Sequence, residues 1–229
     1  MFKELFRLVF PNLCPACEEP LPKGDAHICP ACFERLPKTD FHVQPENPAE
    51  RLFFGRFPFH SVSSAFHFGK GGGVQRVLHQ IKYRGGTELA EQLATWYGMR
   101  LAAQGWFGEA PVFVPVPLHP KKLYRRGYNQ ALHIARGLAD SVPGAVSADY
   151  LIRRDDKGSQ TKKGRYARWQ NVENLFAPAN DTPLTGRHVI LVDDVLTTGA
   201  TLEACARAIQ PALQGGKLSA LTLAFAGTR

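Results

Sequence analysis

One segment limits the fold of this chain more than any other: Val189-Ile-Leu-Val-Asp-Asp-Val-Leu-Thr-Thr-Gly-Ala-Thr201. It joins an apolar run, typical of a buried strand, to two adjacent acids and a turn of small residues that opens a helical pattern. In open α/β folds, ligands bind at the carboxyl edge of the sheet, where such a strand feeds such a helix. The segment therefore predicts a layered α/β domain with a ligand site at this strand end.

The chemistry of the same segment suits a phosphorylated sugar. The small residues from Thr197 to Thr201 let a phosphate approach the backbone, where helix N-terminal amides and threonine hydroxyls can hold it. Asp193 and Asp194 then lie one ribose away and can accept hydrogen bonds from its hydroxyls. A rival interpretation is the acidic end of an ATPase site, but the sequence has no glycine-rich loop ending in Gly-Lys-Ser or Gly-Lys-Thr. A purely structural cluster of acids and threonines is the other alternative.

The remaining patterns predict a central, mainly parallel sheet flanked by helices. Apolar runs and alternating patterns indicate strands at 61–68, 112–116, 148–152, 189–192 and 218–225. Apolar residues at helical spacing indicate helices at 74–83, 87–103, 129–139 and 202–213. We expect this α/β domain to cover residues 59–229, and a linker at 37–58 to join it to a small module at 1–36.

Four of the five cysteines form two copies of one tetrapeptide, Cys14-Pro-Ala-Cys17 and Cys29-Pro-Ala-Cys32. Paired knuckles of this kind present four thiolates, the closed tetrahedral set that structural zinc prefers. Two disulfides are the competing interpretation, although nothing in the sequence indicates an oxidising compartment. Because the thiolates fill every ligand position, we expect Zn²⁺ to hold a small ribbon-like module that needs its metal to fold. The fifth cysteine, Cys205, fits a buried core position.

The positive charge of the chain is unevenly placed. The formal net charge is +8, and residues 121–168 hold twelve Lys and Arg against four Asp and no Glu. Tyr124 and Tyr128 lie among these cations, a pattern that suits phosphates, nucleotides or single-stranded nucleic acid. An ordinary solvated basic face is the alternative.

The first ten residues predict a short amphipathic helix that packs onto the body, with membrane contact as the minor alternative. Lys3, Glu4 and Arg7 interrupt its apolar residues, so it lacks the apolar core of a signal peptide. No run of 18 or more apolar residues occurs in the sequence. We expect a cytoplasmic protein without stable membrane insertion.

These motifs together resemble the ComF family. The segment from Val189 to Thr201 is similar to the phosphoribosyl pyrophosphate signature of type I phosphoribosyltransferases. Further features make the resemblance specific to the ComF family: the cysteine module, Pro115-Val-Pro-Leu118, Arg126-Gly-Tyr-Asn-Gln130, Gln160, Arg168, Asn171 and Phe176. It spans nearly the whole chain except the linker, and it implies a type I phosphoribosyltransferase-like fold and a role in DNA uptake and competence.

The resemblance also implies roles for particular residues. Asp193 and Asp194 would bind the ribose, and the phosphate loop would consist of Thr197, Thr198, Gly199, Ala200 and Thr201. A loop at 117–127 would surround the pyrophosphate with the cations Lys121, Lys122, Arg125 and Arg126. A second basic segment at 155–171 would close over the substrate with Lys157, Lys162, Lys163, Arg165 and Arg168. The catalytic candidates are Asp193, Asp194, Lys162, Arg165 and Arg168, acting on phosphoribosyl pyrophosphate that carries Mg²⁺.

Two functional hypotheses follow. In the first, the protein transfers phosphoribose to a nitrogenous acceptor and releases pyrophosphate. In the second, the same site senses phosphoribosyl pyrophosphate while the basic, aromatic stretch holds single-stranded DNA during uptake or use. In either case a helicase or another uptake protein is a candidate partner for the zinc module. No pattern in the sequence specifies the acceptor or the oligomeric state.

Overall fold

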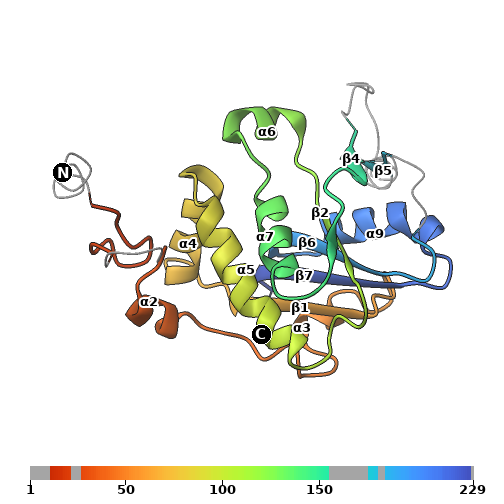
Figure 1. Cartoon of the computed structure of the whole chain (residues 1–229), viewed down its shortest axis with the longest axis horizontal. Helices are drawn as coiled ribbons and strands as arrows, with labels where there is room; N and C mark the ends of the chain where they lie inside the picture. The colour runs from red at the N-terminus through yellow and green to blue at the C-terminus, as the bar shows by residue number, and fades with distance from the viewer. Residues whose placement is uncertain (1–10, 22–26, 155–174, 180–183, 228–229) are drawn as a thin grey trace.

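The computed structural model describes residues 11–21, 27–154, 175–179 and 184–227. Its centre is a five-stranded sheet in the order β1-β7-β6-β2-β3, in which every neighbouring pair is parallel (Figure 1). The strands are β1 (Ser61–His67), β2 (Val112–Pro115), β3 (Ala145–Val146), β6 (His188–Leu196) and β7 (Lys217–Phe225). The predicted mainly parallel α/β fold is therefore confirmed.

Alternate residues of β6 face opposite sides of the sheet, and each side has its own helical layer. Ile190 and Val192 pack in the core formed with α4 (Gly73–Tyr83), α5 (Thr87–Ala102) and α7 (Gln130–Ala139). Val189 and Leu191 pack in the core formed with α9 (Ala200–Leu213). Burial on both faces explains why the strand is a continuous apolar run rather than an alternating pattern.

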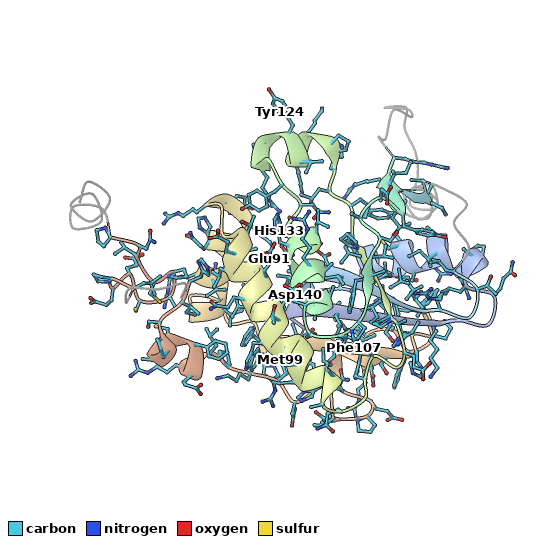
Figure 2. All side chains as sticks on the ribbon, in the orientation of Figure 1. Glu91, Met99, Phe107, Tyr124, His133 and Asp140 are labelled. Atoms are coloured by element: carbon cyan, nitrogen blue, oxygen red, sulfur yellow. The ribbon has the colours of Figure 1, made fainter. Side chains whose placement is uncertain are left out.

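The helices follow the periodicities that the sequence indicated. In α4 the buried residues are Val74, Val77, Leu78 and Ile81, the spacing of one apolar helix face. The helices α5 and α7 pack closely at Gly137. A Cβ at this position would lie 2.2 Å from the Glu91 carbonyl oxygen, so only glycine fits there. His133 Nδ1 of α7 also lies 2.6 Å from Glu91 Oε1 of α5, where Figure 2 shows the two side chains between the helices.

The segment 37–58, predicted as a linker, covers the outer edge of β1. The Thr39 N–H donates to the Ala65 carbonyl (2.9 Å), and the His67 N–H donates to the Pro37 carbonyl (2.7 Å). Asn47 is fully buried, begins α3 (Pro48–Arg51), and donates to the Val62 carbonyl (3.0 Å). Because these contacts satisfy an irregular strand edge, they leave no periodic signature in the sequence.

Three short strands differ from the predictions. The strand predicted at 148–152 forms instead as β4 (Leu151–Arg153), which pairs antiparallel with β5 (Phe176–Pro178) outside the main sheet. The edge strand β3 of the main sheet was not predicted, because two residues are too few for a pattern.

Within the described ranges, every helix falls short of the length and apolarity needed to cross a membrane.

Candidate functional site

The two adjacent acids lie near the carboxyl end of β6 and follow the alternation of the strand. Asp194 continues the face of Ile190 and Val192, and only 5% of its surface is exposed. Its backbone N–H donates to Asp193 Oδ1 (2.8 Å), which fixes the Asp193 carboxylate against the Asp194 backbone. Burial, and then the negative charge of Asp194, raise the pKa of Asp193 to about 7. This strand end therefore concentrates two acids in a space that disfavours negative charge.

Lys82, near the end of α4, supplies the charge that opposes Asp194. Its Nζ lies 3.1 Å from Asp194 Oδ2. The contact is an ion pair outside hydrogen-bond geometry, so Oδ2 is buried without a hydrogen-bond donor among the described residues. Sequence reasoning missed Lys82, because a lysine in the last turn of a helix is ordinary and nothing local marks its partner.

The predicted phosphate loop turns from β6 into α9. Thr197, Thr198, Ala200 and Thr201 are exposed, whereas Gly199 is buried and has a φ of 77°. A Cβ on Gly199 would lie 2.7 Å from two ring carbons of Phe53, so glycine is required for both conformation and space. Gly199 provides no side-chain cap for α9, and the Ala200 N–H makes only a long hydrogen bond to Thr198 Oγ1 (3.5 Å), so this helix start can receive an anion.

The cations predicted around the pyrophosphate lie on a helix rather than on a loop. His119 caps α6 (Pro120–Arg126) by accepting from the Lys121 N–H (3.1 Å), and Gly127 ends it with a φ of 82°. A pocket of about 390 Å³ lies between α6 and the end of α4; its lining is Lys82, Tyr83, Gly85, Lys122, Arg125, Arg126 and Tyr128. The structure thus brings three of the four predicted cations together with Lys82, while Lys121 lies outside the lining.

Electrostatics links this pocket, which we call the basic pocket, to the acids. The charges of Lys82 and Arg126 counteract part of the rise in the pKa of Asp193. The Arg126 guanidinium lies 5.4 Å from the centre of the Tyr83 ring and is hydrogen-bonded to Gln130. The other catalytic candidates, Lys162, Arg165 and Arg168, lie outside the described residues, as do Lys157 and Lys163.

The four predicted zinc ligands converge in the structure. The sulfur atoms of Cys14, Cys17, Cys29 and Cys32 all lie within 4.8 Å of one another, and the Cys17 and Cys29 sulfurs are 3.9 Å apart. Four sulfurs at zinc-bond length around one tetrahedral centre are spaced by roughly 3.8 Å. No disulfide joins these cysteines, which are all free. The cluster is therefore compatible with structural zinc and does not contain the two disulfides of the alternative.

The cysteine cluster shares the core of the α/β domain. Cys14, Ala16 and Leu36 are buried in the same apolar cluster as the inner face of α4. Arg76 of α4 donates from Nε to the Ala16 carbonyl (2.8 Å), directly within the first knuckle. The cysteine cluster is therefore in physical contact with α4.

Comparison with known proteins agrees with this geometry. A phosphoribosyl transferase domain matches residues 124–212, which include both acids and the loop before α9. DNA utilization protein YhgH of Escherichia coli K12 is 30% identical over 129 residues, 55% of this chain and 56% of that protein. Competence protein ComFC of Bacillus subtilis is 29% identical over 150 residues, 66% of this chain and 59% of that protein.

Competence protein F of Haemophilus influenzae is 40% identical over 96 residues, 39% of this chain and 39% of that protein. The chain thus spans little more than half the length of the first two curated relatives and less of the third. All three likenesses are partial, and the domain match adds an independent indication at the acids and the phosphate loop. Taken with the parallel α/β fold, these similarities support a ComF-family phosphoribosyltransferase-like protein.

Proposed function

We propose that this protein binds phosphoribosyl pyrophosphate with Mg²⁺ and transfers its phosphoribosyl group to a nitrogenous acceptor. The observation that carries the proposal is the loop from Thr197 to Thr201, exposed except at Gly199, which follows the two acids and opens α9 without a side-chain cap. Asp193 is only partly buried, and its carboxylate could accept a hydrogen bond from a ribose hydroxyl. A phosphate on the same sugar would then meet the N–H groups of the loop from Thr197 to Thr201.

The basic pocket supports the other half of the proposal. Its cations Lys122, Arg125 and Arg126 suit the pyrophosphate, on which negative charge develops as the bond to C1 of ribose breaks. The electron pair of that bond leaves with pyrophosphate, the acceptor nitrogen forms the new bond to C1, and the acceptor loses its proton. Mg²⁺ bound to pyrophosphate would neutralise part of its charge. The protein itself then acts by holding the sugar and stabilising the leaving group.

Calorimetric titration with phosphoribosyl pyrophosphate and Mg²⁺ tests the proposal. We expect binding by the parent and loss of binding in the Asp193→Asn, Asp194→Asn double variant. Asp149→Asn is the matched control, because Asp149 is an exposed acid distant in sequence from the site. Absence of binding by folded, zinc-loaded parent protein would refute the proposed ligand. Binding without pyrophosphate release, across a screen of nitrogenous acceptors, would instead support a sensor.

The cysteine cluster carries a second part of the proposed function. We propose that one Zn²⁺ per chain, held by Cys14, Cys17, Cys29 and Cys32, organises a module within residues 1–36. Its role is structural, since four thiolates leave no position for a reactive water. Metal analysis of the purified protein should give about one zinc per chain.

One observation favours single-stranded DNA binding as a second candidate function. No residue of α6 is buried, and its Tyr124, 94% exposed, points away from the rest of the molecule at the top of Figure 2. Exposed rings among cations can stack on bases while the cations meet phosphates. The names of the YhgH and competence relatives connect those proteins with DNA utilization and competence.

Fluorescence anisotropy with a labelled single-stranded oligonucleotide tests this candidate. Affinity should fall steeply as salt rises, and it should fall in Tyr124→Ala and in the triple variant Lys162→Ala, Lys163→Ala, Arg165→Ala. Tyr83→Ala provides a comparison, because Tyr83 is also exposed but lies in the basic pocket. Unchanged affinity in both the Tyr124 and the triple variant would exclude these surfaces as the DNA site.

A further inference from the structure

One arginine outside every motif contacts the phosphate loop directly. Arg56, in the segment that precedes β1, donates from Nη1 to the Thr198 carbonyl oxygen (2.7 Å) and to the Leu52 carbonyl oxygen (3.0 Å). The other edge of its guanidinium donates to Glu203 Oε2, from Nε at 3.0 Å and from Nη2 at 2.5 Å. A single side chain thus joins the loop, the first turn of α9 and the turn that follows α3.

The contact with the Thr198 carbonyl determines where the next N–H points. In a trans peptide the C=O and the following N–H lie on opposite sides, so fixing one orients the other. With its carbonyl held by Arg56, the peptide directs the Gly199 N–H away from the guanidinium. Among the described residues, this N–H donates no hydrogen bond. The group is therefore oriented and unused.

Two neighbours keep that peptide in place. The Phe53 ring lies against Gly199 on the side where a Cβ would stand, and the Arg56 guanidinium lies 5.7 Å from the centre of that ring. Gly199 has a φ of 77°, and because glycine lacks a Cβ it restricts the rotation of that peptide little. The Arg56 hydrogen bond supplies that restraint at a residue that has no side chain of its own.

Arg56 also neutralises an acid that lies close to the proposed phosphate. Glu203 is in the first turn of α9, and Arg207 Nη2 donates to its second oxygen (2.9 Å). Burial by itself raises the pKa of Glu203, but hydrogen bonds and charges from Arg207 and Arg56 lower it below its ordinary value. The carboxylate therefore stays ionised, and its two arginines offset the repulsion that it would exert on a bound phosphate.

We propose that Arg56 is a positioning residue that presents the Gly199 N–H to the phosphate of the bound sugar. The inference rests on the proposed function of the loop, and it adds a residue from the segment 37–58, to which the sequence patterns assign no role. Arg56 acts through the backbone and through Glu203, not by touching the substrate.

Binding of ribose 5-phosphate and of phosphoribosyl pyrophosphate, measured calorimetrically in three variants, tests the role. Arg56→Gln should weaken both ligands at least about tenfold, since a hydrogen bond to a charged group is lost. Arg207→Gln is the matched control, because Arg207 also pairs with Glu203 but donates to the Arg56 backbone rather than to the loop. It should weaken binding less than about threefold. Arg56→Lys keeps the charge without the planar fork and should give an intermediate loss.

The NMR resonance of the Gly199 amide distinguishes positioning from general stabilisation. Ribose 5-phosphate should shift this resonance in the parent and in Arg207→Gln, and the shift should be absent in folded Arg56→Gln. Equal losses in Arg56→Gln and Arg207→Gln would assign the effect to the charge of Glu203 and overturn the orienting role. If Arg56→Gln does not fold, a Gly199 shift in Arg56→Lys as large as in the parent would overturn it.

The same experiment separates the inference from the proposed function. Parent protein that binds neither ligand overturns both. If the parent binds and Arg56→Gln has the same affinity and the same Gly199 shift, only the role of Arg56 is overturned.

Discussion

Replacement of Gly199 by alanine tests the packing of the phosphate loop most directly. The new Cβ would lie 2.7 Å from two ring carbons of Phe53, closer than such contacts occur. The ring has little room to move, because Phe53 is 2% exposed and packs edge-on against Phe59 at 4.7 Å between ring centres. The substitution must therefore displace the loop, the ring or both.

The expected cost has two parts. A side chain in the left-handed conformation costs about 1–2 kcal/mol. Overpacking against the ring adds about 1–3 kcal/mol. The matched control is Gly215→Ala, because Gly215 has a φ of 83° but nothing within 4 Å of the position of a Cβ. We expect Gly199→Ala to lower the free energy of unfolding by about 1–3 kcal/mol more than Gly215→Ala does.

Urea unfolding of both variants measures this difference, and calorimetry reports its effect on ligand binding. The double variant Gly199→Ala, Phe53→Leu should recover most of the overpacking part, since the shorter side chain removes the ring atoms. Equal destabilisation by Gly199→Ala and Gly215→Ala, with no coupling to Phe53, would refute the close approach of Phe53 to the loop.

Three further predictions concern the charges and the metal. Lys82→Gln should lower the free energy of unfolding by about 1–3 kcal/mol, between the values for exposed and buried ion pairs, because it leaves Asp194 without its counter-charge. In urea unfolding, adding Asp194→Asn to Lys82→Gln should recover most of the lost stability, and the control Lys122→Gln should cause little loss. If Lys82→Gln destabilised the protein no more than Lys122→Gln does, the ion pair would be contradicted. Asp193→Asn should stabilise the protein at neutral and alkaline pH while weakening ligand binding. Burial and Asp194 raise the pKa of Asp193 from 3.8 to about 7, so the folded state loses stability relative to the unfolded state as pH rises between these values. The stability gained by Asp193→Asn should be absent below this pH range, grow through it and stay constant above it. Thermal unfolding of both proteins across pH measures this gain, and a gain that does not change with pH would contradict the raised pKa. Removal of zinc by a chelator should lower the melting temperature and expose the apolar surface shared with α4, because Cys14, Ala16 and Leu36 belong to that core. Metal-free protein with intact disulfides and an unchanged melting temperature would contradict the structural role of zinc.

Features confined to short stretches of chain were open to prediction from the sequence. The apolar run of β6, its two acids and the small residues before α9 follow one another, so one segment indicates a buried strand, a charged end and an anion site. The two Cys-Pro-Ala-Cys motifs likewise indicate a ligand set, because the number and type of ligands define the site. The helix patterns of α4, α5, α7 and α9 are local for the same reason, since each needs only its own apolar face.

Contacts between distant segments were decided only by the tertiary structure. Lys82 meets Asp194, Arg56 meets the Thr198 carbonyl, and Phe53 meets Gly199, yet none of these residues carries a local pattern that names its partner. The segment 37–58, predicted as a linker, makes hydrogen bonds to a strand edge and to a loop, and these do not repeat along an element and so leave no pattern in the sequence. Sequence therefore determined which chemical groups this site contains, and folding determined which of them are buried, paired and oriented, because those properties depend on neighbours that the chain brings together from far apart.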